Sequence, residues 1–343
     1  MAMRRLPVRP VLLNRRAVLA GGVAVGTAAA LAACGNPEPP VDENGRVRLR
    51  LVVDGPATVD LGGFYQALAT GLYEARDLNV QLVRPGFGQD VPRALATGRA
   101  ELGLVDDGFI PLRLVEEGAP VKAVAAFFQT SPRALVRHAP ATSGEAAPPP
   151  PSALQVANAD RDTLWPWLQA RLDYPDDLIA DYDLDAFLAD PRAVMLGHVA
   201  REPVQIAATE GPATTARLLA EDGFASYGDL LLAPTAFARD NEAALRAFIA
   251  ASIEGWKDYI NGDPEPAHAL IRKALRGRGD QTLGAAHDAL RAAAIVTGGD
   301  SASGIGTMSE AHWQAFFDSA VEAGLAQPEL AWRDAWTPLY LPT

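Results

Sequence analysis

The amino-acid sequence predicts an α/β protein in which mostly parallel, doubly wound sheets form two lobes. Three observations predict this class. Short apolar segments alternate with segments of helical periodicity from residue 47 onward, and this order is typical of parallel sheets covered by helices. A proline-rich stretch interrupts the alternation before it resumes. Hydrophobic residues make up 49% of the 343 residues, which is enough for two packed cores.

The first lobe begins with a predicted strand over residues 47–53. Polar and apolar residues alternate there before the segment becomes fully apolar, as in a strand that enters a buried sheet. The same patterns predict strands at residues 79–83, 101–105 and 121–127, and helices at residues 63–74, 90–96 and 109–116.

A low-complexity stretch at residues 139–152 contains four consecutive prolines, which favour an extended loop near a lobe crossing. A second α/β unit follows, with a helix that opens near residue 162 and a strand at residues 193–196. The C-terminal third is predicted to be helical, and Thr307 begins a capping-box pattern before one of its helices. The predicted division is a signal peptide at 1–33, a tether at 34–46, lobe I at 47–136 and 230–343, a proline-rich loop at 137–151 and lobe II at 152–229.

The N-terminal segment indicates export. Arg15 and Arg16 precede an apolar run rich in alanine and glycine, which is the pattern of a twin-arginine signal peptide. The run ends in Leu-Ala-Ala-Cys at residues 31–34, which resembles the lipobox of bacterial lipoproteins. A retained membrane anchor is the alternative, but residues 17–33 are short and weakly apolar for a hydrocarbon core of about 30 Å. We therefore expect cleavage of the signal peptide and lipidation of Cys34.

Composition limits what the mature protein can do. Cys34 is the single cysteine, so the mature body has no disulfide, cysteine-based zinc site or cysteine nucleophile. Residues 1–33 carry five arginines and no acidic residue, so their removal takes the formal charge from −12 to −17. A body this acidic repels nucleic acids and anionic lipids at long range. We expect no nucleic-acid partner, no cofactor and no metal.

Several stretches, taken in order, resemble one family. A Gly-Gly-Phe-Tyr sequence opens the first predicted helix, and an Ala-Thr-Gly sequence later precedes a strand. The stretches that carry the resemblance are residues 62–73, 94–103, 118–124, 129–132, 163–168, 197–203, 223–224, 255–263 and 304–308. This set is similar to the NMT1/THI5-like, SsuA-type periplasmic binding family, whose members are substrate-binding components of ABC importers. The resemblance implies a periplasmic-binding-protein type II fold, in which two lobes close on a ligand in the cleft between them.

The resemblance also implies the protein's partners. We expect a monomeric, lipid-anchored protein in the periplasm or at the cell surface, which delivers a small molecule to an ABC permease and its ATPase. The alternatives are an orphan receptor that serves a sensor and a pyrimidine-synthase-like enzyme. The enzyme relatives use a histidine and a cysteine-rich iron site, and this chain has neither the cysteines nor a two-histidine metal face. The chain also has Leu196-Gly197-His198 where related sequences have Gln-Gly-Tyr, which leaves the substrate open.

The first-lobe candidates for ligand contact follow from strand direction. Ligands of open α/β sheets lie beyond the carboxyl ends of the strands, which selects four loops. The glycines in these loops either let a ligand approach the backbone or serve tight turns. Of two adjacent aspartates, we expect one to cap the following helix and the other to contact the ligand. The candidates are Asp60, Gly62, Gly63, Tyr65, Phe87, Gly88, Asp106, Asp107 and Gln129.

The second-lobe candidates lie at a helix start and at a strand end. Glu202 is the strongest, because it follows a predicted strand and precedes Pro203. Its alternative role is that of a solvated charge paired with Arg201. Trp165 either packs in the core or forms a wall of the cleft. The full set is Asp162, Thr163, Trp165, His198, Glu202 and Tyr227.

The charges of these candidates bear on the ligand. An anion needs arginine, lysine or helix N-termini and no nearby carboxylate, whereas Asp106, Asp107 and Glu202 are acidic. Carboxylates and aromatic walls suit a planar heterocycle with N–H donors. We expect a thiamine pyrimidine precursor, a riboflavin-like molecule or a related heterocycle, and the alternative is an anion of the nitrate or sulfonate type.

Overall fold

The computed structural model describes residues 41–85, 90–140, 150–276, 280–298 and 304–342. The predicted signal peptide, Cys34, Phe87 and Gly88 lie outside the described residues, as does most of the proline-rich loop. In the described ranges, no helix combines the length and the apolar character that crossing a membrane requires.

The first sheet has five strands in the order β2-β1-β3-β10-β4. β1 is parallel to β2 and β3, whereas β10 is antiparallel to β3 and β4. The first residues of β10 therefore lie at the same edge of the sheet as the last residues of β3 and β4. The bounds are β1 (Val47–Val53), β2 (Leu78–Val83), β3 (Leu102–Val105), β4 (Val121–Phe128) and β10 (Gly228–Pro234).

The second sheet also has five strands, in the order β7-β6-β8-β5-β9. β6 is parallel to β7 and β8, and β5 is antiparallel to β8 and β9. The bounds are β5 (Arg133–His138), β6 (Leu154–Val156), β7 (Ile179–Asp181), β8 (Val194–His198) and β9 (Thr214–Leu218). Both sheets mix directions but are mostly parallel, which agrees with the predicted class.

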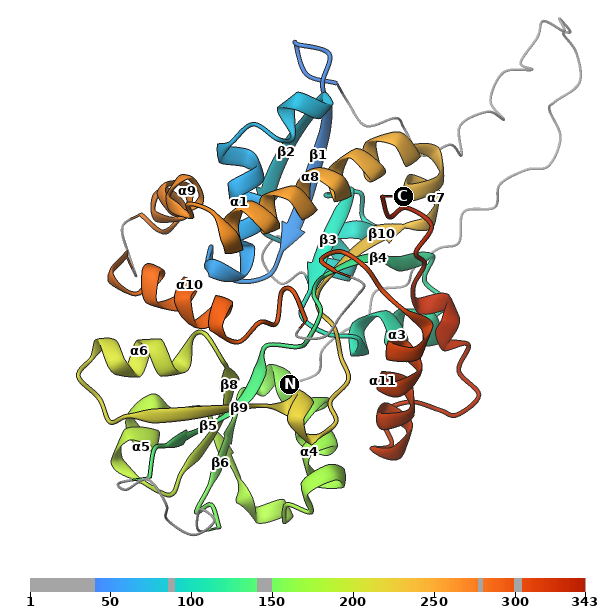
Figure 1. The fold of residues 1–343 in the computed structure, drawn as a ribbon. Helices are drawn as coiled ribbons and strands as arrows, with labels where there is room; N and C mark the ends of the chain where they lie inside the picture. Colours follow the sequence, from blue (N-terminus) through green and yellow to red (C-terminus); the bar gives the residue numbers. More distant parts are fainter. Residues whose placement is uncertain (1–40, 86–89, 141–149, 277–279, 299–303, 343) are drawn as a thin grey trace, which may run out of the picture. The chain divides into compact units, whose positions relative to one another are not determined.

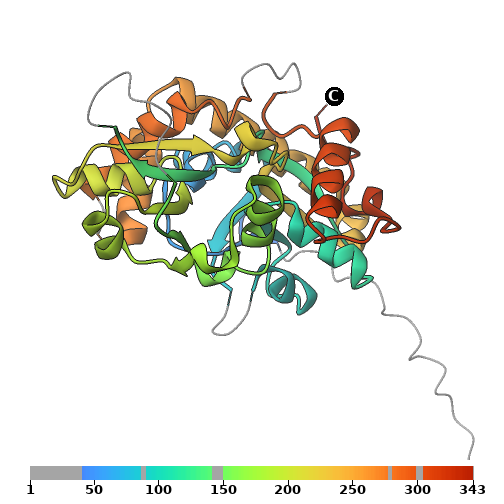
Figure 2. The ribbon, with the colours of Figure 1, turned by 90° about the horizontal axis from the view of Figure 1, so that it is seen from below.

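The chain passes between the two sheets after β4 and again before β10, and the sheets occupy separate parts of the fold (Figure 1). In the view from below, the green and yellow elements of the second sheet overlap the blue strands of the first (Figure 2). Residues 133–136, which the sequence analysis assigned to lobe I, begin β5 in the second sheet. Arg133 already pairs with His198 of β8, so the crossing is limited to a few residues around Pro132. The predicted bounds of the two lobes otherwise stay a prediction.

Helices cover the two sheets. The predicted helix at residues 63–74 ends as α1 at Ala69, because Gly71 adopts a φ of 75°. The predicted capping box is displaced, because Ser309 and not Thr307 accepts the N-terminal hydrogen bond of α11, from the amide of His312. The helices are α1 (Gly62–Ala69), α2 (Val91–Ala96), α3 (Phe109–Glu116), α4 (Leu164–Leu172), α5 (Leu184–Ala189), α6 (Glu202–Ala208), α7 (Thr235–Asp240), α8 (Glu242–Asn261), α9 (Glu265–Leu275), α10 (Leu283–Ala292) and α11 (Glu310–Glu322).

Close packing of α1 on α8 fixes the loop that follows β1. A Cβ atom on Gly62 would lie 2.1 Å from the ring of Tyr259, and one on Gly63 would lie 2.1 Å from the ring of Trp256. No side chain fits at either distance, so the glycine pair lets the two helices approach. The pair is explained by packing between two segments almost 200 residues apart in sequence.

The interior strand β10 contributes to the core on both faces of the first sheet. Leu231 packs in one cluster with residues of α1 and α8, such as Phe64 and Phe248. Leu230 and Leu232 pack in a second cluster on the other face, together with residues of α3 and α11. Because β10 is held on both faces, its first residues form a rigid edge beside the loops after β3 and β4.

Candidate ligand-binding site

Two cavities share Arg133 and Asp160 in their linings. The first has a volume of about 480 Å³ and is lined by residues that follow β1 and β3 in the first lobe, together with Asp162 and Thr163 of the second. The second has a volume of about 330 Å³ and is lined by second-lobe residues that include Tyr182 and the segment at 196–202. Since both cavities share Arg133 and Asp160, we treat them as one interlobe cleft.

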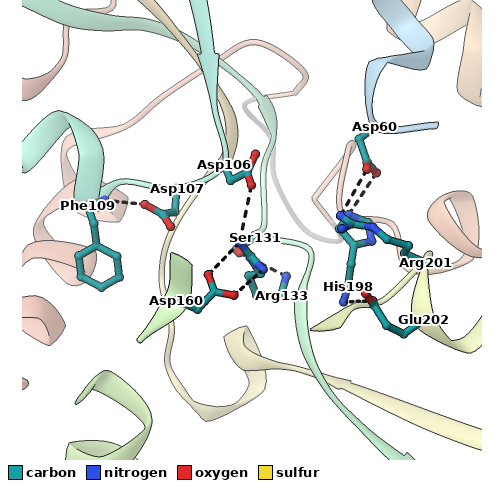
Figure 3. Close-up of polar contacts among 10 residues, drawn as sticks. All are labelled: Asp60, Asp106, Asp107, Phe109, Ser131, Arg133, Asp160, His198, Arg201 and Glu202. Carbon is teal, nitrogen blue, oxygen red and sulfur yellow. Dashed lines mark hydrogen bonds and ion pairs between the residues drawn. The ribbon is translucent and has the colours of Figure 1, made fainter. Parts of the chain in front are cut away.

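Arg133 connects the two sides of this cleft. Its Nη1 donates to Oδ2 of Asp160 at 3.2 Å, and its Nη2 lies 3.6 Å from Oδ2 of Asp106 (Figure 3). Asp160 follows β6 in the second sheet, whereas Asp106 follows β3 in the first. Burial lowers the pKa of Arg133, but Asp160 and then Asp106 and Asp107 raise it, and the net shift is upward. The guanidinium therefore stays charged and ties the lobes together.

A second interlobe contact centres on Asp60, in the 3₁₀ turn Val59–Leu61. Its Oδ1 lies 3.1 Å from Nε2 of His198, and its Oδ2 lies 3.8 Å from Nη2 of Arg201 (Figure 3). Oδ2 also accepts a hydrogen bond from the hydroxyl of Thr58 at 2.9 Å. Burial raises the pKa of Asp60, but His198, Arg201 and Thr58 together lower it below its ordinary value. Asp60 is therefore an ionised residue of the first lobe that holds two basic residues of the second.

Glu202 supports the loop that carries His198. Its Oε2 accepts a hydrogen bond from the backbone N–H of His198 at 2.5 Å, and its Oε1 accepts one from the hydroxyl of Tyr182 at 3.1 Å. The side chain is buried, and Gly197 leaves the room that its carboxylate occupies. Glu202 is thus not a solvated charge. Both of its oxygens have protein donors, which fix the position of His198.

The two aspartates after β3 lie in different surroundings. Oδ1 of Asp107 accepts a hydrogen bond from the amide of Phe109 at 2.9 Å at the start of α3. Burial raises the pKa of Asp107 to about 6, against the opposing effect of Arg133. Asp106 is exposed and faces Arg133. Asp107 therefore caps the helix, and Asp106 is available to the cleft.

Seven of the predicted residues are absent from the linings of both cavities, namely Asp60, Gly62, Gly63, Tyr65, Gln129, Trp165 and Tyr227. The amide of Gln129 is buried and donates to the carbonyl oxygens of Ala126 and Thr307. The hydroxyl of Tyr227 accepts a hydrogen bond from the amide of Ser309. Trp165 is 8% exposed and packs in the second core cluster. These side chains hold the crossings and the core. Tyr65 is half-buried on α1.

The structure adds residues that the sequence analysis did not select. Arg133, Asp160 and Tyr182 line the cleft, and Asp229 begins β10 beside the end of β3, outside both linings. Arg133 could have been suspected, because it directly follows the Ser131-Pro132 pair at the crossing. No sequence pattern singles out Asp229, because its position in the fold depends on the antiparallel direction of β10. Among the described residues, no group of three or more His, Cys, Asp or Glu side chains is arranged to hold a metal ion.

The relation to known proteins rests on one family. Residues 58–142, from the Asp60 turn through β5, match the family described as NMT1/THI5 like. This segment is similar to that family. The resemblance predicted from the sequence is therefore confirmed over this part of the chain. No curated protein matches the sequence.

Solved structures share the fold. The periplasmic aliphatic sulphonate binding protein SsuA from Escherichia coli superimposes with a TM-score of 0.59 at 15% identity, over 85% of this chain and 92% of that chain. The alkanesulfonate-binding protein SsuA from Xanthomonas axonopodis pv. citri, bound to MOPS, gives 0.53 at 15% identity, over 86% and 98%. The desulfurization enzyme DSZB gives 0.50 at 11% identity, over 85% and 97%. This likeness confirms the predicted periplasmic-binding-protein fold.

Proposed function

We propose that this chain is the solute-binding component of an ABC-type importer, exported and anchored to a membrane through a lipid on Cys34. The observation that carries the proposal is the cleft between the two sheets, to which both lobes contribute charged side chains. The Arg133 and Asp60 contacts each join the lobes through side chains, so hinge motion can make and break them as a solute enters and leaves. The NMT1/THI5-like segment and the shared fold support the same function.

The anchor can be tested separately from binding. Replacement of Cys34 by alanine removes the thiol that lipidation requires, so the variant should leave the membrane fraction or accumulate as a precursor. Fractionation followed by intact-mass measurement checks this. Processing and membrane retention like those of the wild type would refute lipidation at Cys34.

For the ligand class, the comparisons support the anion alternative better than the predicted heterocycle, because two of the similar structures are sulfonate-binding proteins. In the cleft, the basic group best placed to hold an anionic head group is Arg201. Its side chain is 46% exposed, and its one ion pair with a described residue, Asp60, spans 3.8 Å. Arg133 is less available, because Asp160 and Asp106 already surround it. We therefore propose an organic anion such as a sulfonate as the first candidate, held by Arg201 beside His198.

The heterocycle is kept as a second candidate because of the carboxylates in the cleft. Asp106, Asp160 and Glu202 lie beside the basic residues and would repel a simple anion. They could instead accept hydrogen bonds from the N–H groups of an aminopyrimidine. A flat solute would find an aromatic wall in Tyr182, which lines the same cavity.

Thermal denaturation of the Cys34→Ser chain without its signal peptide separates these candidates. The solutes are MOPS, ethanesulfonate, nitrate, riboflavin and 4-amino-5-hydroxymethyl-2-methylpyrimidine, and a bound solute raises the melting temperature. If an anion binds, Arg201→Gln should weaken it by about 10- to 100-fold, since a charge-assisted hydrogen bond contributes about 1.5–3 kcal/mol. Arg239→Gln is the matched control, because Arg239 lies on α7 and is paired with Asp240. Equal loss in both variants would refute the role of Arg201.

The same experiments address the alternatives to an importer. Uptake of the bound solute by cells that lack the gene separates an importer component, whose loss abolishes uptake, from a receptor that serves a sensor. We propose binding without catalysis, although the fold is shared with an enzyme. The charged groups described in the cleft are paired with one another, and conversion of the bound solute, followed by mass spectrometry, would refute this part of the proposal.

A further inference from the structure

The direction of β10 places Asp229 at the edge of the first sheet where β3 ends. Leu230 pairs with Val105 in antiparallel register, so Asp229 lies beside the end of β3, where Asp106 follows. This is the edge of the sheet beyond which ligands of α/β proteins bind. Asp229 thus joins Asp106 and Asp60 at the same edge, although it begins a strand and they follow the ends of two others.

The side chain of Asp229 is buried and has no protein partner among the described residues. It is 6% exposed, and its Oδ2 has no hydrogen-bond partner there. Buried carboxyl groups are almost always hydrogen-bonded, because an unmet hydrogen bond inside a protein is unfavourable. Burial first, and then the charges of Asp60 and Asp106, raise its pKa well above the ordinary value.

The backbone of Asp229 is also held in an uncommon conformation. Its φ is 45°, in the left-handed region that residues other than glycine rarely adopt. Such conformations persist where the surroundings hold them, and they concentrate at ligand sites. The packing of Leu230, Leu231 and Leu232 on both faces of the sheet supplies that support. The carboxyl group is therefore kept at this edge of the sheet at a conformational cost.

The neighbouring basic residues do not neutralise Asp229. His198 and Arg201 face Asp60, and Arg133 faces Asp160 and Asp106. The described basic residues therefore leave Oδ2 of Asp229 without a partner, and a hydrogen-bond donor on a bound solute would satisfy it. We propose that Asp229 is a specificity-determining residue that accepts a hydrogen bond from an N–H or ammonium group of the bound solute.

This inference rests on the proposed function and narrows it. A solute that fits this cleft carries an N–H or ammonium group that donates a hydrogen bond to Asp229. If the solute is an organic anion such as a sulfonate, its anionic group lies near Arg201. Simple inorganic anions such as nitrate have no donor and are excluded as good ligands. The paired sulfonates taurine and ethanesulfonate differ by such an amino group. The aminopyrimidine of the panel and its counterpart without the 4-amino group, 5-hydroxymethyl-2-methylpyrimidine, differ in the same way.

The test compares these two pairs by isothermal titration with the Cys34→Ser chain and with its Asp229→Asn variant. Asparagine tolerates the left-handed region better than other residues and has the same shape, so folding should be retained. In the unsubstituted Asp229 protein, the nitrogen-bearing member of a pair should bind at least 10-fold more tightly. In Asp229→Asn, that preference should fall about 10-fold, while affinity for the other member stays within about twofold.

Asp77→Asn is the matched control, because Asp77 also has a left-handed φ, 55°, and directly precedes β2 at the opposite edge of the sheet. It should keep the preference unchanged. Equal binding of both members of a pair, or a preference that survives Asp229→Asn, would refute the role of Asp229 and leave the proposed function standing. If no member of either pair binds, both the nitrogen contact and the two proposed ligand classes are refuted.

Discussion

Replacement of Glu202 by glutamine separates two roles for this carboxylate. In the structure, Glu202 accepts one hydrogen bond from the backbone of His198 and one from Tyr182. Charge-assisted hydrogen bonds contribute about 1.5–3 kcal/mol each, and neutral ones about 0.5–1.5 kcal/mol. Glutamine keeps one acceptor oxygen for the amide of His198, and the hydroxyl of Tyr182 can turn to accept from the new amide. Loss of the charge should therefore lower the free energy of unfolding by about 1–2 kcal/mol.

Urea denaturation followed by tryptophan fluorescence measures this change. Glu329→Gln is the control, because Glu329 is exposed and lies far along the chain, and its free energy of unfolding should change by less than about 0.5 kcal/mol. A direct ligand contact, as the sequence analysis expects, would instead leave stability unchanged and weaken solute binding by about 10- to 100-fold. Unchanged stability of Glu202→Gln would thus refute the supporting role and favour direct contact.

Two further predictions concern packing and pH. Gly63→Ala should lower the free energy of unfolding by about 1–3 kcal/mol, because its Cβ would meet the ring of Trp256. Gly284→Ala, in open space on α10, should instead raise the free energy of unfolding by up to about 1 kcal/mol. Denaturation curves that show equal effects of the two substitutions would contradict this. The folded-state pKa of Asp107 is raised to about 6. The folded state therefore binds more protons than the unfolded state between about pH 4 and pH 6. As a result, the free energy of unfolding should fall as pH rises through this window. Asp107→Asn, which keeps an acceptor for the amide of Phe109, should remove that fall and be more stable than the wild type at pH 7, and an unchanged pH profile would contradict the assignment.

Local sequence patterns predicted most of the elements of the first lobe. The helix at 109–116 and the strands near 79–83 and 121–127 occur within one residue of the expected bounds. Their periodicity reflects burial on one or both faces, which is a local property of each segment. The hydrogen bond that Asp107 accepts at the start of α3 was also predictable, because a polar side chain just before a helix commonly accepts such a bond.

Long-range pairings were not predictable in the same way. The reason for Gly62 and Gly63 lies in Tyr259 and Trp256, on a helix almost 200 residues later. Likewise, an apolar strand such as β10 has the same pattern in either direction, so its antiparallel return, and with it the position of Asp229, cannot be inferred from periodicity.

The environment of Tyr182 has a practical consequence for following solute capture in solution. Tyr182 is 39% exposed and lines the cavity beside Glu202, whereas Trp165, Trp167, Trp256, Trp313 and Trp332 are buried. Intrinsic tryptophan emission is therefore poorly placed to sense events in the cleft. Because the chain has a single cysteine, a Cys34→Ser, Tyr182→Cys double substitution creates one thiol at the mouth of the cavity. A polarity-sensitive dye attached to this thiol would report binding of the solute through a change in the dye's fluorescence.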